Sequence, residues 1–392
     1  MIACRAAVSN GAVNGGRSTV DVNCQLSTVD WPGFPVVILS AASTLYGAAA
    51  TWRRHWYARH PARRARLSRP VVSVGNLRAG GSGKTPAVAY LARVLLARGE
   101  RPAVLTRGYA RRVRAPGVTV VSDGSNVLVG LDRAGDEPLM LARALPGVPV
   151  LVGANRHASG LMAEARFGAT VHILDDGFQH LALARAVDLL LVTEDDLSGR
   201  VLPAGRLREP LASAASADAL IVASESDRGV ERVRSTLGLA TAFRLRRAIG
   251  PPLRVTPDPR GSNGHTDAGA GVNATRPVFA VAGIARPERF FGDLAAAGWS
   301  VAGTMAFDDH HSFTDADIER IVGAARAADT ATIVTTEKDA VRLEDRSLGG
   351  LTLAVIPLTV TIEPADAFAA WLFARIGAPS APEHPGPKHL ST

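Results

Sequence analysis

The strongest chemical signal in the sequence is a glycine-rich stretch, VVSVGNLRAGGSGKTP, at residues 71–86. A β-rich run leads into it and a helical pattern follows, which is typical of a phosphate-binding loop between a strand and a helix. Backbone N–H groups, a lysine and a hydroxyl in such a loop can bind phosphate oxygens and Mg²⁺. The residues predicted to do so are Gly80, Gly81, Ser82, Gly83, Lys84 and Thr85. The strict pattern has glycine where this chain has Arg78, but the strand–loop–helix context argues against a chance match.

Lysine is rare in this chain, so each lysine is informative. The sequence has 41 arginines and only three lysines, Lys84, Lys338 and Lys388. Because arginine is used almost wherever a cation is needed, a retained lysine indicates a site that requires a compact charge on a flexible stem. Lys84 fits this interpretation within the glycine loop. Lys338, in VTTEKDAV, is predicted to contact nucleotide as well, and the alternative is a solvated loop lysine.

Two adjacent carboxylates end an apolar run in HILDDGFQH, residues 172–180. Asp175 and Asp176 resemble the strand-end carboxylates that hold Mg²⁺ or its water opposite a phosphate-binding loop. The alternative is a simple turn in which an aspartate bonds to its own backbone. We favour the metal-binding interpretation, and Gln179 and His180 either join the site or orient the loop.

Two further motifs could handle protons. Asp136, in GDEPLMLA, is by local pattern a good helix N-cap. In FDDHHSFTDADI, Asp309, His310 and His311 precede a helix with Thr314 as its expected cap. Adjacent histidines can bind metal, but no second cluster with ligand spacing accompanies them, so an Asp/His pair for proton transfer is the better interpretation of this loop.

The elements that must position these residues follow an alternating pattern. From residue 70, short β-rich runs alternate with helical stretches of 10–15 residues, which predicts parallel strands covered by helices on both faces. A Pro- and Gly-rich stretch separates a second alternating region. The only cysteines, Cys4 and Cys24, offer no disulfide framework. The expected organisation is an unstructured leader (1–30), a membrane-interface helix with a basic segment (31–69), a first α/β domain (70–250), a linker (251–276), a second, smaller α/β domain (277–377) and a loose tail (378–392).

The positive charge of the chain is concentrated in one segment. The net charge is +8, and seven arginines lie between Arg53 and Arg69, directly after an uncharged run of 18 residues at 34–51. The rest of the chain is close to neutral, which argues against a nucleic-acid-binding protein. An apolar helix flanked by aromatics and followed by arginines favours an interfacial helix on an anionic membrane surface. A true membrane span and a core helix with a solvated basic end are the alternatives.

Six motifs in this order resemble the tetraacyldisaccharide 4′-kinase family of lipid A biosynthesis. They are the glycine loop, DDGFQH, LPAGRLREP (202–210), GIARPERFF (283–291), DDHHSF and TTEKDAV, and the resemblance runs from about residue 31 to 373. It implies two α/β/α domains with the active site between them. It also implies a kinase at the cytoplasmic face of the inner membrane that uses ATP and Mg²⁺. The acceptor would be the 4′-hydroxyl of a lipid A disaccharide 1-phosphate.

The resemblance also implies roles for individual residues. Lys84 and Thr85 would contact phosphate and metal, with Asp175 and Asp176 as the acidic pair near Mg²⁺. Asp136 and His310 would form the proton-handling pair. The resemblance thus favours a catalytic role for Asp136 over its local interpretation as a helix cap. Four residues match family positions near the cleft without an assigned role: Tyr109, Arg206, Arg208 and Arg286.

A different class of function shares part of this pattern. A P-loop NTPase switch or metallochaperone, which hydrolyses nucleotide to regulate a partner, would have the same glycine loop and strand-end aspartate. It would not account for the arginine-rich apolar segment, or for Asp136 together with His310. We therefore expect the kinase, with a lipid substrate and a membrane surface as partners and no obligate protein partner.

Overall fold

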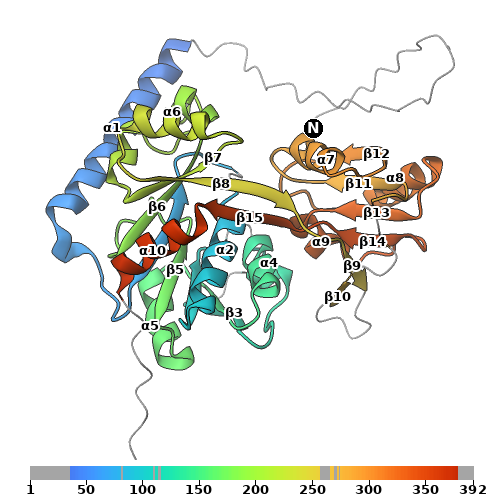
Figure 1. Cartoon of the computed structure of the whole chain (residues 1–392), viewed down its shortest axis with the longest axis horizontal. Coiled ribbons are helices and arrows are strands. Elements are labelled where there is room, and N and C mark those ends of the chain that lie inside the picture. Colours follow the sequence, from blue (N-terminus) through green and yellow to red (C-terminus); the bar gives the residue numbers. More distant parts are fainter. Residues whose placement is uncertain are drawn as a thin grey trace, which may run out of the picture.

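The computed structural model describes residues 36–80, 83–108, 111–113, 116–256, 265–268, 272 and 274–377. The expected leader (1–30), the tail (378–392), Tyr109 and two members of the glycine loop, Gly81 and Ser82, lie outside the described residues. The described part folds into two α/β units (Figure 1). This confirms the α/β fold class.

The larger unit is built on a nine-stranded sheet in the order β15-β8-β7-β6-β1-β5-β2-β4-β3. Its strands pair in parallel except at the two edges, where β3 and β15 run antiparallel to their neighbours. The central strand β1 is buried along its whole length, as expected for a strand covered on both faces. The strand bounds are β1 Val71–Asn76, β2 Pro102–Thr106, β3 Thr119–Asp123, β4 Pro149–Val152, β5 Val171–Asp175, β6 Val187–Thr193, β7 Ala219–Ala223, β8 Ala242–Ile249 and β15 Leu358–Glu363.

Helices cover both faces of the large sheet. Val72 packs in one core with α2, α4 and α10, whereas its neighbour Val71 packs on the other face with α5. The alternation of strand side chains thus places an apolar layer on each face. The helix bounds are α2 Lys84–Ala97, α3 Leu131–Ala134, α4 Asp136–Ala144, α5 Arg156–Phe167, α6 Asp227–Leu237 and α10 Ala365–Ile376, with 3-10 helices η1 Pro61–Arg63, η2 Glu194–Ser198 and η3 Leu211–Ser216.

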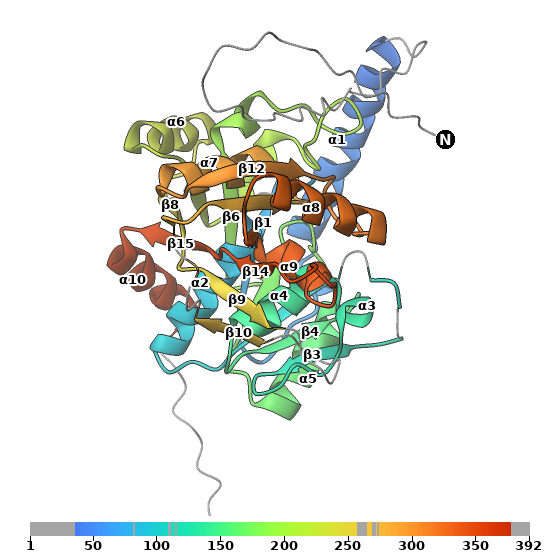
Figure 2. The ribbon, with the colours of Figure 1, turned by 90° about the vertical axis from the view of Figure 1, so that its right-hand side faces the viewer.

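The smaller unit has a six-stranded sheet in the order β10-β9-β14-β13-β11-β12, again with an apolar core on each face. Its helix α8 begins after a capping box between Thr314 and Asp317, so the expected cap at Thr314 is confirmed. Helix α9 lies against α4 of the larger unit (Figure 2). The bounds are β9 Leu253–Thr256, β10 His265–Ala268, β11 Val278–Ala282, β12 Val301–Ala306, β13 Thr332–Thr335, β14 Thr352–Val355, α7 Pro287–Ala296, α8 Asp315–Ala327 and α9 Glu337–Leu343.

The end of the described chain corrects the expected domain boundaries. Strand β15 leaves the smaller unit and pairs antiparallel with β8 in the large sheet, and α10 packs there through Phe368 against Phe243 (Figure 1). Residues 358–376 therefore belong to the first sheet rather than to the second domain. The expected linker, 251–276, contains β9 and β10 of the second sheet. A strand pattern in a sequence carries no information about which of two sheets the strand will join.

Helix α1, Val36–Arg59, lies along one edge of the larger unit. Gly47 faces Pro210 and Val201, while Leu45 and Trp52 are 72% and 67% exposed. The described helices include none with both the length and the apolar character needed to cross a bilayer. Arg54 is buried, so the arginines that follow the apolar run do not form one solvated group.

The close contact between β1 and the loop after β5 makes a stability prediction. A Cβ on Gly75 would lie 2.5 Å from Phe178 Cβ and 2.6 Å from the Phe178 backbone nitrogen. We expect Gly75→Ala to lower the free energy of unfolding by about 1–3 kcal/mol, because backbone must shift. Gly323→Ala in α8, where a Cβ meets open space, should raise it by roughly 0.5–1 kcal/mol. Urea unfolding measures both, and equal effects would contradict the tight contact.

Candidate active site

The glycine loop lies at the carboxyl end of β1 and leads directly into α2. Gly80 and Gly83 have φ values of 101° and 82°, in the left-handed region that glycine adopts without strain. A Cβ at either position would meet open space, so backbone conformation rather than crowding requires glycine there. Lys84 and Thr85 begin α2 just after Gly83. The structure thus places both predicted side chains at a helix N-terminus, where anions are favoured.

Lys84 is held beside the second strand-end aspartate. Its Nζ lies 2.9 Å from Asn76 Oδ1 and 3.3 Å from Asp176 Oδ1. Asp176 has a φ of 52° and also accepts hydrogen bonds from Arg208 Nη1 at 2.7 and 2.9 Å. Burial opposes ionisation of Asp176, but the charges of Lys84 and Arg208 outweigh it and hold its pKa below the usual value. Asp176 is therefore an ionised carboxylate at the phosphate-binding loop.

The pKa of Asp175 is shifted in the opposite direction to that of Asp176. It is fully buried and accepts a hydrogen bond from Thr106 Oγ1 at 2.9 Å. Burial, followed by the nearby carboxylates of Glu137 and Asp176, raises the pKa of Asp175 to about 7. The carboxylates of Glu137 and Asp176 thus both disfavour a negative charge on Asp175. Among the residues that the structure describes, no group of three or more His, Cys, Asp or Glu side chains is placed to hold a metal ion.

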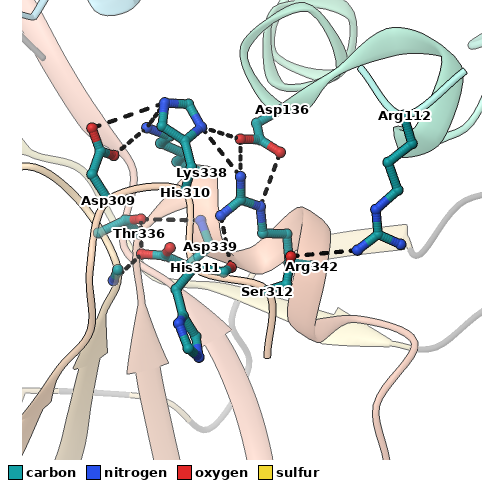
Figure 3. A network of polar contacts seen from close by, with 11 residues as sticks. Arg112, Asp136, Asp309, His310, His311, Ser312, Thr336, Lys338, Asp339 and Arg342 are labelled. Carbon is teal, nitrogen blue, oxygen red and sulfur yellow. Dashed lines mark hydrogen bonds and ion pairs between the residues drawn. The ribbon is translucent and has the colours of Figure 1, made fainter. Parts of the chain in front are cut away.

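Asp136 meets His310 across the boundary between the two units (Figure 3). Asp136 Oδ2 lies 2.8 Å from His310 Nδ1. Arg342 donates from Nε to Asp136 Oδ1 at 2.9 Å and from Nη2 to Oδ2. The N-cap position of α4 is occupied by Gly135, and Asp136 is the first residue of the helix itself. The structure therefore contradicts the local interpretation of Asp136 as an N-cap.

The charge of Asp136 is set by these contacts. Burial of its carboxyl disfavours ionisation, yet the hydrogen bond from His310 and the positive charge of Arg342 together lower its pKa below the ordinary value. Asp136 is only 5% exposed, so water screens these interactions weakly. It is an ionised acceptor that faces a histidine ring.

Lys338 lies on the other side of the same histidine. Its Nζ is 2.6 Å from Asp309 Oδ1 and 3.1 Å from His310 Nε2 (Figure 3). Thr336 caps α9 by accepting from the backbone nitrogen of Asp339, which fixes where Lys338 projects. Lys338 thus belongs to the Asp136–His310 group in this structure, and its contact with nucleotide stays a prediction.

Comparison with known proteins assigns the chain to a family. The model of the tetraacyldisaccharide-1-P 4′-kinase family matches residues 36–377. The chain belongs to this family. Tetraacyldisaccharide 4′-kinases from Geobacter metallireducens and from an Anaeromyxobacter species are 38% and 41% identical, over 79% and 80% of this chain and 88% and 84% of theirs. A crystal structure of LpxK from Aquifex aeolicus, described as an apo form in complex with ATP, superposes with a TM-score of 0.69 at 31% identity, covering 87% of this chain and 99% of that one.

Sequence reasoning missed two residues of the site in this member of the 4′-kinase family. Arg342 follows Lys338 by four residues on α9, so both face the same side, but one arginine among 41 gives no signal. Asn76, which receives Lys84, ends β1 as an ordinary polar residue. Of the residues matched by resemblance alone, Arg208 binds Asp176, whereas Arg286 contacts Asp195 at 3.1 Å.

The Arg342 contact makes a prediction about the titration of Asp136. Removing the guanidinium in Arg342→Gln takes away a positive charge that favours the carboxylate, so the pKa of Asp136 should rise. Carbon-13 NMR of labelled aspartate carboxyls measures it. The control, Arg346→Gln, removes an arginine whose partners are Asp315 and the Phe313 carbonyl, and should leave the Asp136 titration in place. An unchanged pKa in Arg342→Gln would contradict the charge coupling.

Proposed function

We propose that the chain is an ATP-dependent kinase that phosphorylates the 4′-hydroxyl of a tetraacyldisaccharide 1-phosphate. The observation that carries the proposal is the pairing of Asp136 with His310 across the two units, in a member of the 4′-kinase family that also has Lys84 at a phosphate-binding loop. The loop that carries Lys84 can hold ATP, and the Asp136–His310 pair can receive a proton. A nucleotide-hydrolysing switch needs only the ATP-binding loop.

The phosphate end works by charge and alignment. Phosphoryl transfer passes through a loose transition state, so the protein mainly has to position donor and acceptor and offset negative charge. Lys84 and the backbone N–H groups at the start of α2 would face the phosphates of ATP. Asp176, already ionised between Lys84 and Arg208, keeps the lysine directed toward the loop.

We further propose that Mg²⁺ binds beside this loop, held by Asp175, Asp176 and Thr85. Their oxygens have the chemistry that Mg²⁺ prefers. When bound, the ion would offset negative charge on the outer phosphates. The pKa of Asp175, about 7, and the proximity of its carboxylate neighbours support this assignment, because a divalent cation relieves their mutual repulsion.

The acceptor end handles the proton. Asp136 is ionised at neutral pH, and His310 donates to it through Nδ1. With this hydrogen bond fixed, His310 keeps its other nitrogen, Nε2, on the side of Lys338. The sugar hydroxyl would release its proton late to the Asp136–His310 pair, after the phosphoryl group has begun to transfer.

We also propose that α1 binds the cytoplasmic face of the inner membrane, where a multiply acylated acceptor resides. Exposed Leu45 and Trp52 supply apolar surface, and exposed Arg59, Arg63 and Arg66 supply charge next to it. The combination is typical of a helix that lies in a membrane interface. Arg54 is excluded from this surface because it is buried.

A direct assay tests the proposed function. Purified protein is mixed with γ-labelled ATP, Mg²⁺ and the detergent-dispersed disaccharide 1-phosphate, and label is sought on the sugar. Label should appear with the native chain and disappear with Lys84→Ala, which loses the charge at the phosphate loop. Release of labelled inorganic phosphate without labelled sugar would favour the NTPase switch instead.

The proton-accepting role of Asp136 predicts a loss of rate. Asp136→Asn should lower kcat by roughly 10² or more, because the amide accepts no proton. Asp366→Asn is the matched control, since Asp366 is an exposed aspartate in the first turn of α10. Steady-state kinetics well below the melting temperature of each variant compares them. Retained kcat in Asp136→Asn would remove the assignment.

The membrane proposal predicts binding that depends on salt. Changing Arg59, Arg63 and Arg66 to Gln should weaken binding to anionic vesicles by about 1 kcal/mol for each arginine near the surface. Vesicle binding by the native chain should also fall as salt rises, because screening shortens the reach of the attraction. Leu45→Asp should release the protein even at low salt. Arg232→Gln, an exposed change on α6, is the control. Co-sedimentation that responds to none of these changes would exclude the interfacial helix.

A further inference from the structure

Several backbone carbonyls of a loop at the active site are held by arginines. We call residues 175–180, which run from the last residue of β5, the Asp loop. Four successive backbone carbonyls of this loop each accept a hydrogen bond from a guanidinium. Arg185 donates to Gly177 O (2.9 Å) and His180 O (3.1 Å), Arg54 to Phe178 O (3.1 Å) and Arg53 to Gln179 O (3.0 Å). Two of these three arginines come from α1, about 120 residues away in the chain.

Arg54 is the deeper of the two α1 contacts. It is 8% exposed, donates to both oxygens of Glu209 at 2.8 and 2.9 Å, and lies 4.1 Å from the centre of the Phe178 ring. Ser216 takes a further hydrogen bond at 2.7 Å. Only a guanidinium has enough donors, in a fixed plane, to serve all these acceptors at once.

The same contacts continue to the phosphate-binding loop. Phe178 is fully buried against Gly75 of β1. Gln179 donates from Nε2 to the Asn76 carbonyl at 3.0 Å, and the Asn76 side chain receives Lys84 at 2.9 Å. An unbroken set of contacts therefore joins α1, the Asp loop and Lys84.

We propose that Arg53 and Arg54 are positioning residues of the phosphoryl-transfer site, which set the placement of Asp176 and Lys84 by holding the Asp loop. This rests on the proposed function. The loop follows β5 without a helix, so its carbonyls need partners from elsewhere. Helix α1 supplies these partners at Phe178 and Gln179. It thus has a second role, separate from membrane binding: its seating on the larger unit fixes the geometry of the site.

The test separates the two roles of α1 by using an acceptor that needs no membrane. Arg54→Lys keeps the positive charge beside Glu209 but loses the planar guanidinium with its several donors. Arg53→Gln removes one hydrogen bond made by an exposed side chain and leaves the core intact. With a water-soluble, short-chain disaccharide 1-phosphate, kcat should fall roughly tenfold to a hundredfold in Arg54→Lys, and a few-fold in Arg53→Gln, as expected for small displacements of reacting groups. Binding of Arg53→Gln to anionic vesicles should change far less than its kcat.

Hydrogen exchange measured by mass spectrometry reports on the loop itself. Peptides that cover 175–180 should exchange faster in both variants. Arg326→Gln is the matched control, because it also removes a hydrogen bond from an arginine to a loop carbonyl, that of Gly349, outside the site. It should alter neither kcat nor exchange at 175–180.

Three results would overturn the proposal. The first is full kcat on the soluble acceptor in Arg54→Lys and Arg53→Gln, even if vesicle binding falls. The second is unchanged exchange at 175–180. The third is faster exchange and a lower melting temperature with kcat unaltered well below that temperature, which is the pattern of a purely structural contact. If the native chain phosphorylates neither the soluble acceptor nor the detergent-dispersed disaccharide 1-phosphate, the proposed function fails, and exchange at the Asp loop still decides whether α1 holds it.

Discussion

Two ionised carboxylates, one buried and one half-buried, are each neutralised by cations from another part of the chain and determine how the rest of the molecule is arranged. Asp136 meets Arg342, and Asp176 meets Lys84 and Arg208. Asp136 is buried, and a buried charge that loses its partner costs several kcal/mol, so this pair tolerates little displacement of the helices that carry it. The first pair holds α4 against α9 and thereby joins the two sheets. The second ties the loop after β5 to the start of α2.

The contact between Lys84 and Asp176, within the larger unit, could be predicted from the sequence. The contacts of Asp136 with the smaller unit could be predicted only in part. Lys84 follows β1 and Asp176 follows β5, and carboxyl ends of neighbouring parallel strands lie at the same edge of a sheet. Asp136 and His310 are 174 residues apart, and only the resemblance to a known family paired them. Arg342 escaped prediction because arginine is the default cation of this chain. The role of Arg342 depends on its contact with Asp136, which no local sequence pattern encodes.

The basic segment illustrates the limit of counting charges. Summed along the sequence, the arginines after the apolar run form a single cluster. The structure divides them: Arg54 is enclosed by Glu209 and Phe178, while Arg59, five residues later on the same helix, is exposed. Helical periodicity separates residues that are adjacent in sequence, so neighbouring arginines on one helix can face protein and solvent.

The return of β15 to the first sheet has a consequence for the order of assembly. The two α/β units do not follow one another along the polypeptide, because the edge strand and α10 of the larger unit are made after the smaller unit. During synthesis, the exposed edge of β8 waits while residues 250–357 are added, which takes roughly 5–20 s at ribosomal speeds. An unpaired strand edge is a template for association with other chains. The nascent protein therefore passes through an interval in which a chaperone or the partly formed second sheet must shield β8.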